Sequence, residues 1–265
     1  MQPPSLPAIV QVGLYEEFPN PWRLAKLNQI DFSVSLAVAA PTREAFLQLR
    51  ESIQRDYPQV RRVFFWPLLA AEEGYYPGPL SDPQAVRRVM AEATDLPVLW
   101  DLELPPGLKH ISSPFSSLPQ NRAATAAWLR GRTQPVPIWR SYAPLGLNPW
   151  LLRALGLHYD PTDYPAVSLH LDLYTTGVGQ PEQGLQRLMR DGVAAYGARF
   201  IPSLGVLNDG EGAESQFIPP ETLRRNLRIA RASGVCELWL FGVNGLNAAY
   251  LRAVREELPL ESLSG

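Results

Sequence analysis

Short apolar runs alternate along the chain with longer stretches in which apolar residues recur at helical spacing. A run of roughly four to eight apolar or β-branched residues, bounded by proline, glycine or polar turn residues, predicts a buried strand. The longer amphipathic stretches between the runs predict helices. We expect strands over residues 8–15, 31–39, 62–69, 97–105, 136–142, 166–174, 199–207 and 237–242.

The predicted helices begin and end at residues with known capping preferences. Pro21 suits the first turn of a helix over 21–29, and Thr42 caps a helix over 42–56. A third helix starts at Ser81 or Asp82 and ends near Thr94. The remaining helices are expected over 119–132, 148–155, 181–196, 219–233 and 246–257, the helix over 219–233 being closed by Gly234.

Eight strand–helix units succeed one another within 265 residues. Strands that alternate with helices indicate a parallel sheet, and eight such units in roughly 250 residues are typical of a closed (β/α)8 TIM barrel. An open doubly wound sheet is the alternative, and it usually carries a glycine-rich phosphate turn after its first strand. Here that turn reads GLYEEFPN, with a single glycine. The sequence therefore predicts an α/β protein whose residues 1–265 form one barrel domain.

Composition narrows the function classes. The net charge is -2 and the pI is about 6.0, which gives no basis for nucleic-acid binding. One cysteine, Cys236, excludes an internal disulfide and a multi-cysteine metal cluster. No apolar stretch reaches the roughly 18 residues that a membrane-spanning helix needs. The first residues lack the basic and apolar regions of a signal peptide. We expect a cytoplasmic protein without a membrane partner, although a mature chain cut from a precursor would look the same.

The sequence lacks the residues that two classes of barrel enzyme need. A Schiff-base aldolase needs a lysine on a strand, but Lys26 falls in a helix and Lys109 in a loop. A histidine-rich metal site needs several strand-end histidines, and of His110, His158 and His170 only His170 lies on a predicted strand. The sequence predicts neither a metal nor another cofactor.

The stretch Pro97 to Pro105 (PVLWDLELP) carries two carboxylates at the end of an apolar strand. Successive side chains of a strand point to opposite faces, so Asp101 and Glu103 share one face. Burying a charge is costly unless the charge is paired or used. Because barrel active sites lie at the C-terminal ends of the strands, we expect this pair to face a pocket there.

The same alternation on other strands predicts a polar and aromatic lining rather than the Val, Ile and Leu that fill a purely structural barrel. On the fifth strand the facing pair is either Arg140 and Tyr142 or Trp139 and Ser141. Aromatic faces with carboxylates and an arginine suit a sugar, whose C–H faces are apolar. The predicted substrate-binding residues are Tyr15, Trp66, Arg140, Tyr142, His170 and Trp239, and the predicted catalytic residues are Glu103, Asp101, Asp172 and Tyr174.

Structural interpretations of the same residues remain open. Arg140 with Asp101 or Asp172 is equally consistent with a structural ion pair. His170 fits a hydrogen-bonded core histidine, and the two tryptophans fit ordinary packing. Four further acidic residues, Glu16, Glu17, Glu72 and Glu73, come after predicted strands and are expected to be solvated loop charges.

Asp101-Leu102-Glu103-Leu104-Pro105 resembles the end of the strand-4 signature of family-18 glycoside hydrolases, the chitinases and their relatives. Asp172-Leu173-Tyr174 is similar to that family's strand-6 tyrosine region, and Trp239 falls where the family often has a strand-8 tryptophan. The two further aspartates of the full signature are replaced here by Leu96 and Leu99. The resemblance implies that Glu103 is the general acid, that Asp101 orients an N-acetyl group, and that Tyr174 hydrogen-bonds to it.

The function predicted from the sequence is a glycoside hydrolase-like enzyme that acts on a small-molecule or oligosaccharide substrate through carboxylate acid catalysis at the barrel mouth. Repulsion between two neighbouring carboxylates suits Glu103 to the role of proton donor. A non-catalytic carbohydrate-binding barrel, or a barrel lyase or isomerase, remains the alternative.

Overall fold

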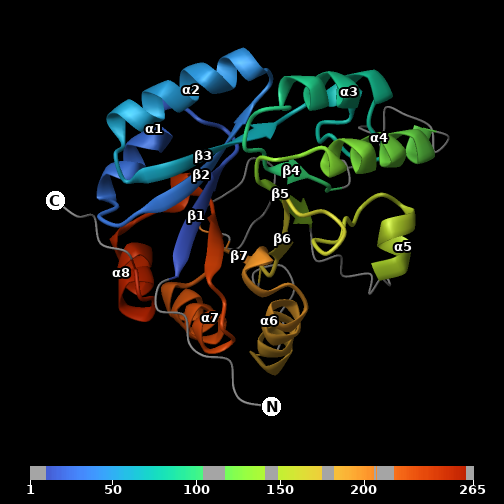
Figure 1. Ribbon diagram of the computed structural model, residues 1–265. Helices are drawn as coiled ribbons and strands as arrows, with labels where there is room; N and C mark the ends of the chain where they lie inside the picture. Colours follow the sequence, from blue (N-terminus) through green and yellow to red (C-terminus); the bar gives the residue numbers. More distant parts are fainter. Residues whose placement is uncertain are drawn as a thin grey trace. The chain divides into compact units, whose positions relative to one another are not determined.

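The computed structural model describes residues 10–103, 117–140, 149–174, 182–205, 207 and 218–260. Strands and helices alternate along these residues (Figure 1). The strands are β1 (Gln11–Glu16), β2 (Val34–Ala40), β3 (Val60–Pro67), β4 (Trp100–Asp101), β5 (Val136–Arg140), β6 (Val167–Asp172), β7 (Phe200–Gly205) and β8 (Glu237–Phe241). The α-helices are α1 (Pro21–Leu24), α2 (Arg43–Asp56), α3 (Pro83–Glu92), α4 (Leu118–Arg130), α5 (Pro149–Ala154), α6 (Glu182–Tyr196), α7 (Pro220–Ala232) and α8 (Ala248–Glu257).

Short 3-10 helices complete the described secondary structure. They are η1 (Ala25–Gln29), η2 (Ala71–Glu73), η5 (Gly197–Arg199) and η6 (Val243–Gly245). None of the described helices is long and apolar enough to cross a bilayer.

The eight strands form one parallel sheet in the order β3-β2-β1-β8-β7-β6-β5-β4. A parallel bridge between Phe65 of β3 and Val98, just before β4, joins the two strands at the ends of this order. Backbone hydrogen bonds from Phe65 to Pro97 and from Leu99 to Phe65, 2.9 and 2.8 Å long, support that bridge. Eight parallel strands in a nearly closed barrel, each followed by a helix, confirm the predicted (β/α)8 fold class.

The chain divides into two compact units. The first comprises Met1–Ala37, Ser52–Val63 and Leu171–Gly265, and the second comprises Val38–Glu51 and Phe64–His170. The sequence prediction of one domain over the whole chain stays a prediction.

Several helix ends are capped by residues that the sequence predicts as caps. The Thr42 hydroxyl accepts the Ala45 N–H at 3.2 Å, and the Asp82 carboxylate accepts the N–H groups of Gln84 and Ala85 at 2.8 and 2.9 Å. Each cap satisfies donors that the first turn of a helix leaves without partners. Beyond the end of α7, Gly234 has φ +82°, a conformation that favours glycine.

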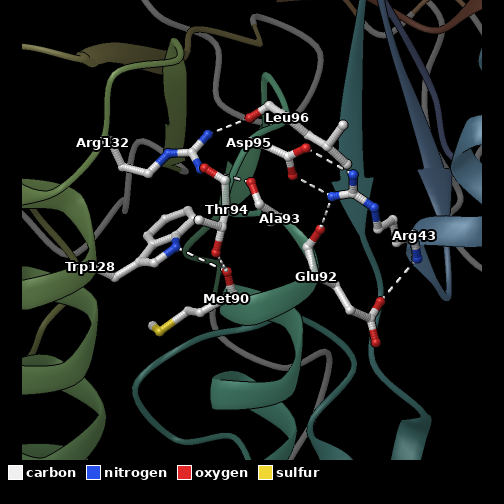
Figure 2. A network of polar contacts seen from close by, with 9 residues as sticks. All are labelled: Arg43, Met90, Glu92, Ala93, Thr94, Asp95, Leu96, Trp128 and Arg132. Carbon is white, nitrogen blue, oxygen red and sulfur yellow. Dashed lines mark hydrogen bonds and ion pairs between the residues drawn. The ribbon is translucent and has the colours of Figure 1, made fainter.

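Two arginines connect α2, α3 and α4 within the second unit (Figure 2). Arg132 donates to the carbonyl oxygens of Ala93, Thr94 and Leu96 beyond the end of α3. The Trp128 indole N–H donates to the Met90 carbonyl at 3.1 Å. These donors satisfy carbonyl groups at a helix C-terminus and hold the turn that leads into β4.

Arg43 makes the second set of contacts in this network. Its backbone N–H donates to the Glu92 carboxylate at 2.9 Å, and its guanidinium donates to the Glu92 carbonyl at 2.9 Å. The guanidinium also binds both carboxylate oxygens of Asp95 (Figure 2). The hydrogen bonds from Arg43 lower the pKa of Asp95 from 3.8 to about 2. The start of α2 is thereby fastened to the turn before β4.

Arg43→Gln is expected to return the pKa of Asp95 toward its usual value, because the bidentate cation is lost. Since the folded pKa is lowered, the pair contributes stability above about pH 4, and that contribution is lost as the pH falls toward 2. The measurement is an NMR pH titration of the Asp95 carboxyl carbon in both proteins. Arg87→Gln, which changes an arginine of α3, is the control. An unchanged Asp95 pKa in Arg43→Gln would show that the pair does not form in solution.

Candidate active site

The regular part of the fourth strand is shorter than the sequence predicts. Strand β4 holds two residues rather than the expected 97–105, of which 104 and 105 lie outside the described residues. The Leu102 N–H still donates to the carbonyl of Trp139 at 3.0 Å. The Glu103 N–H instead donates to Oδ1 of Asp101 at 2.9 Å. The Asp101 carboxylate accepts a backbone N–H that would otherwise bond to a neighbouring strand. The strand-to-strand hydrogen bonding therefore ends at Glu103.

Trp100 and Asp101 point to opposite faces of β4. The Trp100 ring lies 4.6 Å from the ring of Trp128, so this face is the one that α4 covers. Asp101 lies on the face turned away from α4, which in a (β/α)8 barrel is the interior. It is 1% exposed, whereas Glu103 is partly exposed. A buried carboxylate therefore anchors the backbone of a more accessible one.

Two tryptophans lie on the same side of the sheet as Asp101, the side turned away from the helices, which we call the helix-free face. Trp139 of β5 is in register with Asp101. The ring of Trp139 lies 4.9 Å from the ring of Trp66 on β3, and both side chains are buried. Of the two facing pairs left open by the sequence, the register thus places Trp139 beside Asp101. The Arg140 side chain and the whole of Tyr142 lie outside the described residues.

A second cluster lies in the first unit, on β1, β7 and β8. The hydroxyls of Tyr15 and Ser203 share a hydrogen bond of 2.7 Å, and the Tyr15 ring lies 4.8 Å from the Trp239 ring. Gly13 and Ser203 are both in register with Trp239. A Cβ atom at Gly13 would stand 2.1 Å from the Trp239 indole, so the ring lies directly over the β1 backbone. The glycine provides the space that this indole occupies.

The polar end of this cluster fixes the indole from one side. The Trp239 indole N–H donates to the Glu237 carboxylate at 2.8 Å, and Arg62 binds the same carboxylate oxygen at 3.1 Å. Arg62 also donates to Gln11 at 2.8 Å and to the hydroxyl of Ser35 at 3.0 Å. Because its N–H is satisfied and its ring is fully buried, Trp239 is a packing residue in this arrangement. It supports Tyr15 rather than presenting a free surface.

The aromatic cluster extends toward the end of β6. The Phe241 ring lies 6.1 Å from Tyr15 and 6.3 Å from Tyr174. Asp172 is buried, and Tyr174, two residues further along, is partly exposed. Among the sequence-predicted residues whose side chains the structure describes, Glu103 and Tyr174 are thus the partly exposed members. His170, also on β6, is fully buried.

Glu16 is a buried carboxylate, contrary to the sequence prediction. The sequence predicts a solvated loop charge, but Glu16 is 2% exposed at the end of β1. Its Oε1 accepts the Phe18 N–H at 2.9 Å and binds Arg23 at 3.2 Å. Burial raises the pKa of Glu16, and these contacts partly oppose the rise. The Arg23 guanidinium also lies over the ring of Phe18, 5.3 Å from its centroid.

The other expected loop charges differ among themselves. Glu73 is not simply solvated, because it pairs with Arg88 at 2.7 Å and accepts the Ala70 N–H at 3.2 Å. Glu72 is exposed, as expected. Among the residues that the structure describes, no group of three or more His, Cys, Asp or Glu side chains is placed to hold a metal ion. The expected absence of a metal or other cofactor stays a prediction.

Gly13→Ala is expected to destabilise the protein by about 1–3 kcal/mol, because the added methyl group displaces the Trp239 indole from its site. Urea unfolding followed by tryptophan fluorescence measures the change. The matched control is Gly131→Ala, where a Cβ atom would meet its nearest neighbour at an ordinary 3.6 Å. Equal stability of Gly13→Ala and the wild type would mean that the indole does not lie over β1.

Comparisons with known proteins identify solved structures that share this fold. No family model matches the sequence. No curated protein matches it either. A chitinase from Rhizomucor miehei superposes with a TM-score of 0.60 at 11% identity, over 93% of this chain and 99% of that one. A GH18 chitinase from Pseudoalteromonas aurantia superposes with a TM-score of 0.59 at 11% identity, over 94% and 100%.

A sugar epimerase also shares the fold, at the same low sequence identity. The D-allulose 3-epimerase from Methylomonas sp. gives a TM-score of 0.54 at 11% identity, over 96% of this chain and 100% of that one. Identities this low show a shared fold and leave the chemistry to the residues of this chain. The protein therefore has the TIM-barrel fold found in glycoside hydrolases and in sugar epimerases.

Proposed function

We propose that this protein is a carbohydrate-active enzyme of the glycoside hydrolase type, with Glu103 as its general acid. The observation that carries the proposal is the link between Asp101 and Glu103. A fully buried carboxylate on the helix-free face of β4 holds the backbone of a partly exposed one, two residues further toward the C-terminal end. In (β/α)8 enzymes this end of the strands carries the catalytic groups.

Asp101 acts as a positioning residue in this proposal. Its Oδ1 fixes the Glu103 N–H at 2.9 Å, which limits the directions in which the Glu103 side chain can leave the strand. Catalytic groups must be held within a fraction of an ångström to be effective, so a buried anchor directly before the acid is an advantage. Because Asp101 is buried, water does not compete for its hydrogen bond to the Glu103 N–H.

Glu103 would protonate the glycosidic oxygen as the bond to the leaving sugar breaks. Glycosidases pair such an acid with a second group that stabilises the oxocarbenium-like transition state. Asp172 and Tyr174 at the end of β6 are the proposed second group, in keeping with the strand-6 resemblance to family-18 enzymes. Tyr174 is the more exposed residue of the two, but its hydroxyl oxygen is buried, so donation to a substrate oxygen would require the ring to move.

The buried aromatic residues support this proposal as scaffolding. Trp66 and Trp139 pack beside Asp101, and Tyr15 packs on Trp239. Their size fills the helix-free faces and leaves the strand ends to the polar groups. Direct sugar contact by Tyr15, Trp66 or Trp239 would need a change from their buried state. We assign substrate contact first to Glu103, which is partly exposed.

Glu103→Gln is expected to keep the fold and sugar binding and to lower turnover by roughly 100-fold or more, the scale of a lost acid–base catalyst. The assay is turnover of a panel of chromogenic glycosides, including N-acetylglucosaminides, with ligand binding measured by calorimetry in parallel. Glu44→Gln, on the exposed side of α2, is the control and should behave as the wild type.

Each other outcome has a definite meaning. Equal turnover by the wild type and Glu103→Gln would remove Glu103 as the acid. Binding without turnover in the wild type would favour the non-catalytic carbohydrate-binding barrel. Interconversion of free sugars without cleavage would favour an isomerase. A wild type that neither binds nor converts any sugar would overturn the proposed function.

A further inference from the structure

A pocket of about 380 Å³ lies in the second unit. One wall is α4, and the other is formed by Arg153 of α5 and the segment from His158 to Tyr164. Its size falls in the range of pockets that bind small molecules. None of the residues proposed for catalysis lines it.

The α4 wall is determined by the sequence of that helix. Arg122 and Arg130 lie eight residues apart, which is about 12 Å along a helix, and Ala123 and Ala126 lie between them. The small alanine side chains leave a hollow between the two arginines. The helix therefore presents two guanidinium groups at either end of a recess.

The contacts that the structure gives to the two guanidinium groups involve no carboxylate. Arg122 donates to the carbonyl of Ala154 at 2.9 Å, and its stem packs against Gly156, where a Cβ atom would stand 3.2 Å away. Arg130 lies over the ring of Tyr164, 5.8 Å from its centroid. Among the described residues no ion pair engages either arginine. Both arginines are exposed, and no carboxylate of the described residues compensates their positive charge.

The two acidic residues of the pocket differ in burial and in pairing. Asp160 is buried and already paired with Arg153, and His158 lies 3.9 Å from the same carboxylate oxygen. Asp163 is exposed on the rim. Two uncompensated cations thus face one exposed carboxylate, so the pocket favours an anion.

We propose that this pocket binds a small oxyanionic ligand, one that carries a phosphate or carboxylate group on a body of monosaccharide size. Arg122 and Arg130 bind the oxyanion through charge-assisted hydrogen bonds, which planar guanidinium groups make in pairs. The hollow over Ala123 and Ala126 gives space for the oxyanion between the two arginines, and the body of the ligand extends from it toward the open side of the pocket. The proposal is independent of the proposed glycosidase function, because it uses none of that function's residues.

The test is calorimetric titration of the full chain with inorganic phosphate, glucose 6-phosphate, glucuronate and, as a neutral control, glucose. Arg122→Gln and Arg130→Gln are each expected to weaken binding of the anions about tenfold, the effect of losing one charge-assisted contact. Asp163→Asn is expected to tighten it, because a like charge is removed. Arg252→Gln, on the exposed side of α8, is the matched control and should change nothing.

Thermal unfolding of each variant establishes that it is folded. Arg130→Gln removes no hydrogen bond to the backbone of the residues that the structure describes, so it serves if Arg122→Gln is unstable. Preference for glucose 6-phosphate over glucuronate identifies a phosphate ligand, and the reverse identifies a carboxylate ligand. The proposal is overturned if no anion binds. It is equally overturned if glucose binds as tightly as the anions, or if Arg252→Gln weakens binding as much as the pocket variants.

Discussion

The two-residue alternation of the strands is the constraint on which the rest of the structure depends. In the second unit it sends Phe65 to the ring of Phe46 on α2 and Trp100 to α4, while Asp101 faces away from the helices. In the first unit it places Tyr15 and Trp239 on one face of β1 and β8. A shift of one residue on any strand would exchange these two sets and bury the polar groups against helices.

The buried carboxylates show how this constraint is used. Asp101 and Glu16 both stand near the ends of strands, and each accepts a backbone N–H from the residue two positions later. Glu16 is also paired with Arg23, which makes it part of the fold at the start of α1. Asp101 instead holds Glu103, a second and more accessible carboxylate. The two carboxylates therefore differ in what they hold. Glu16 holds part of the fold, whereas Asp101 holds the backbone of a residue of the candidate site.

Most of the architecture could be predicted from local pattern. All eight strands and eight α-helices of the described residues were predicted, because apolar periodicity and caps such as Asp82 are encoded within a few residues. The end of β4 was not, since it depends on one side chain taking a backbone donor. The burial of Glu16 depends on Arg23, and nothing in a single sequence reveals that partner. The pocket beside Arg130 arises where α4 packs against residues 153–164, so no motif marks it. Whether the residues of β4 and β6 act together stays a prediction.

The central claim is that carbohydrate binds where the strands end, against Glu103. A crystal structure of the protein soaked with a short N-acetylated oligosaccharide tests this most directly. The account predicts a sugar ring at the C-terminal ends of the strands, with the Glu103 carboxyl group within hydrogen-bond distance of a glycosidic oxygen. Sugar density elsewhere on the molecule, with the Glu103 side chain turned toward the helices, would contradict it.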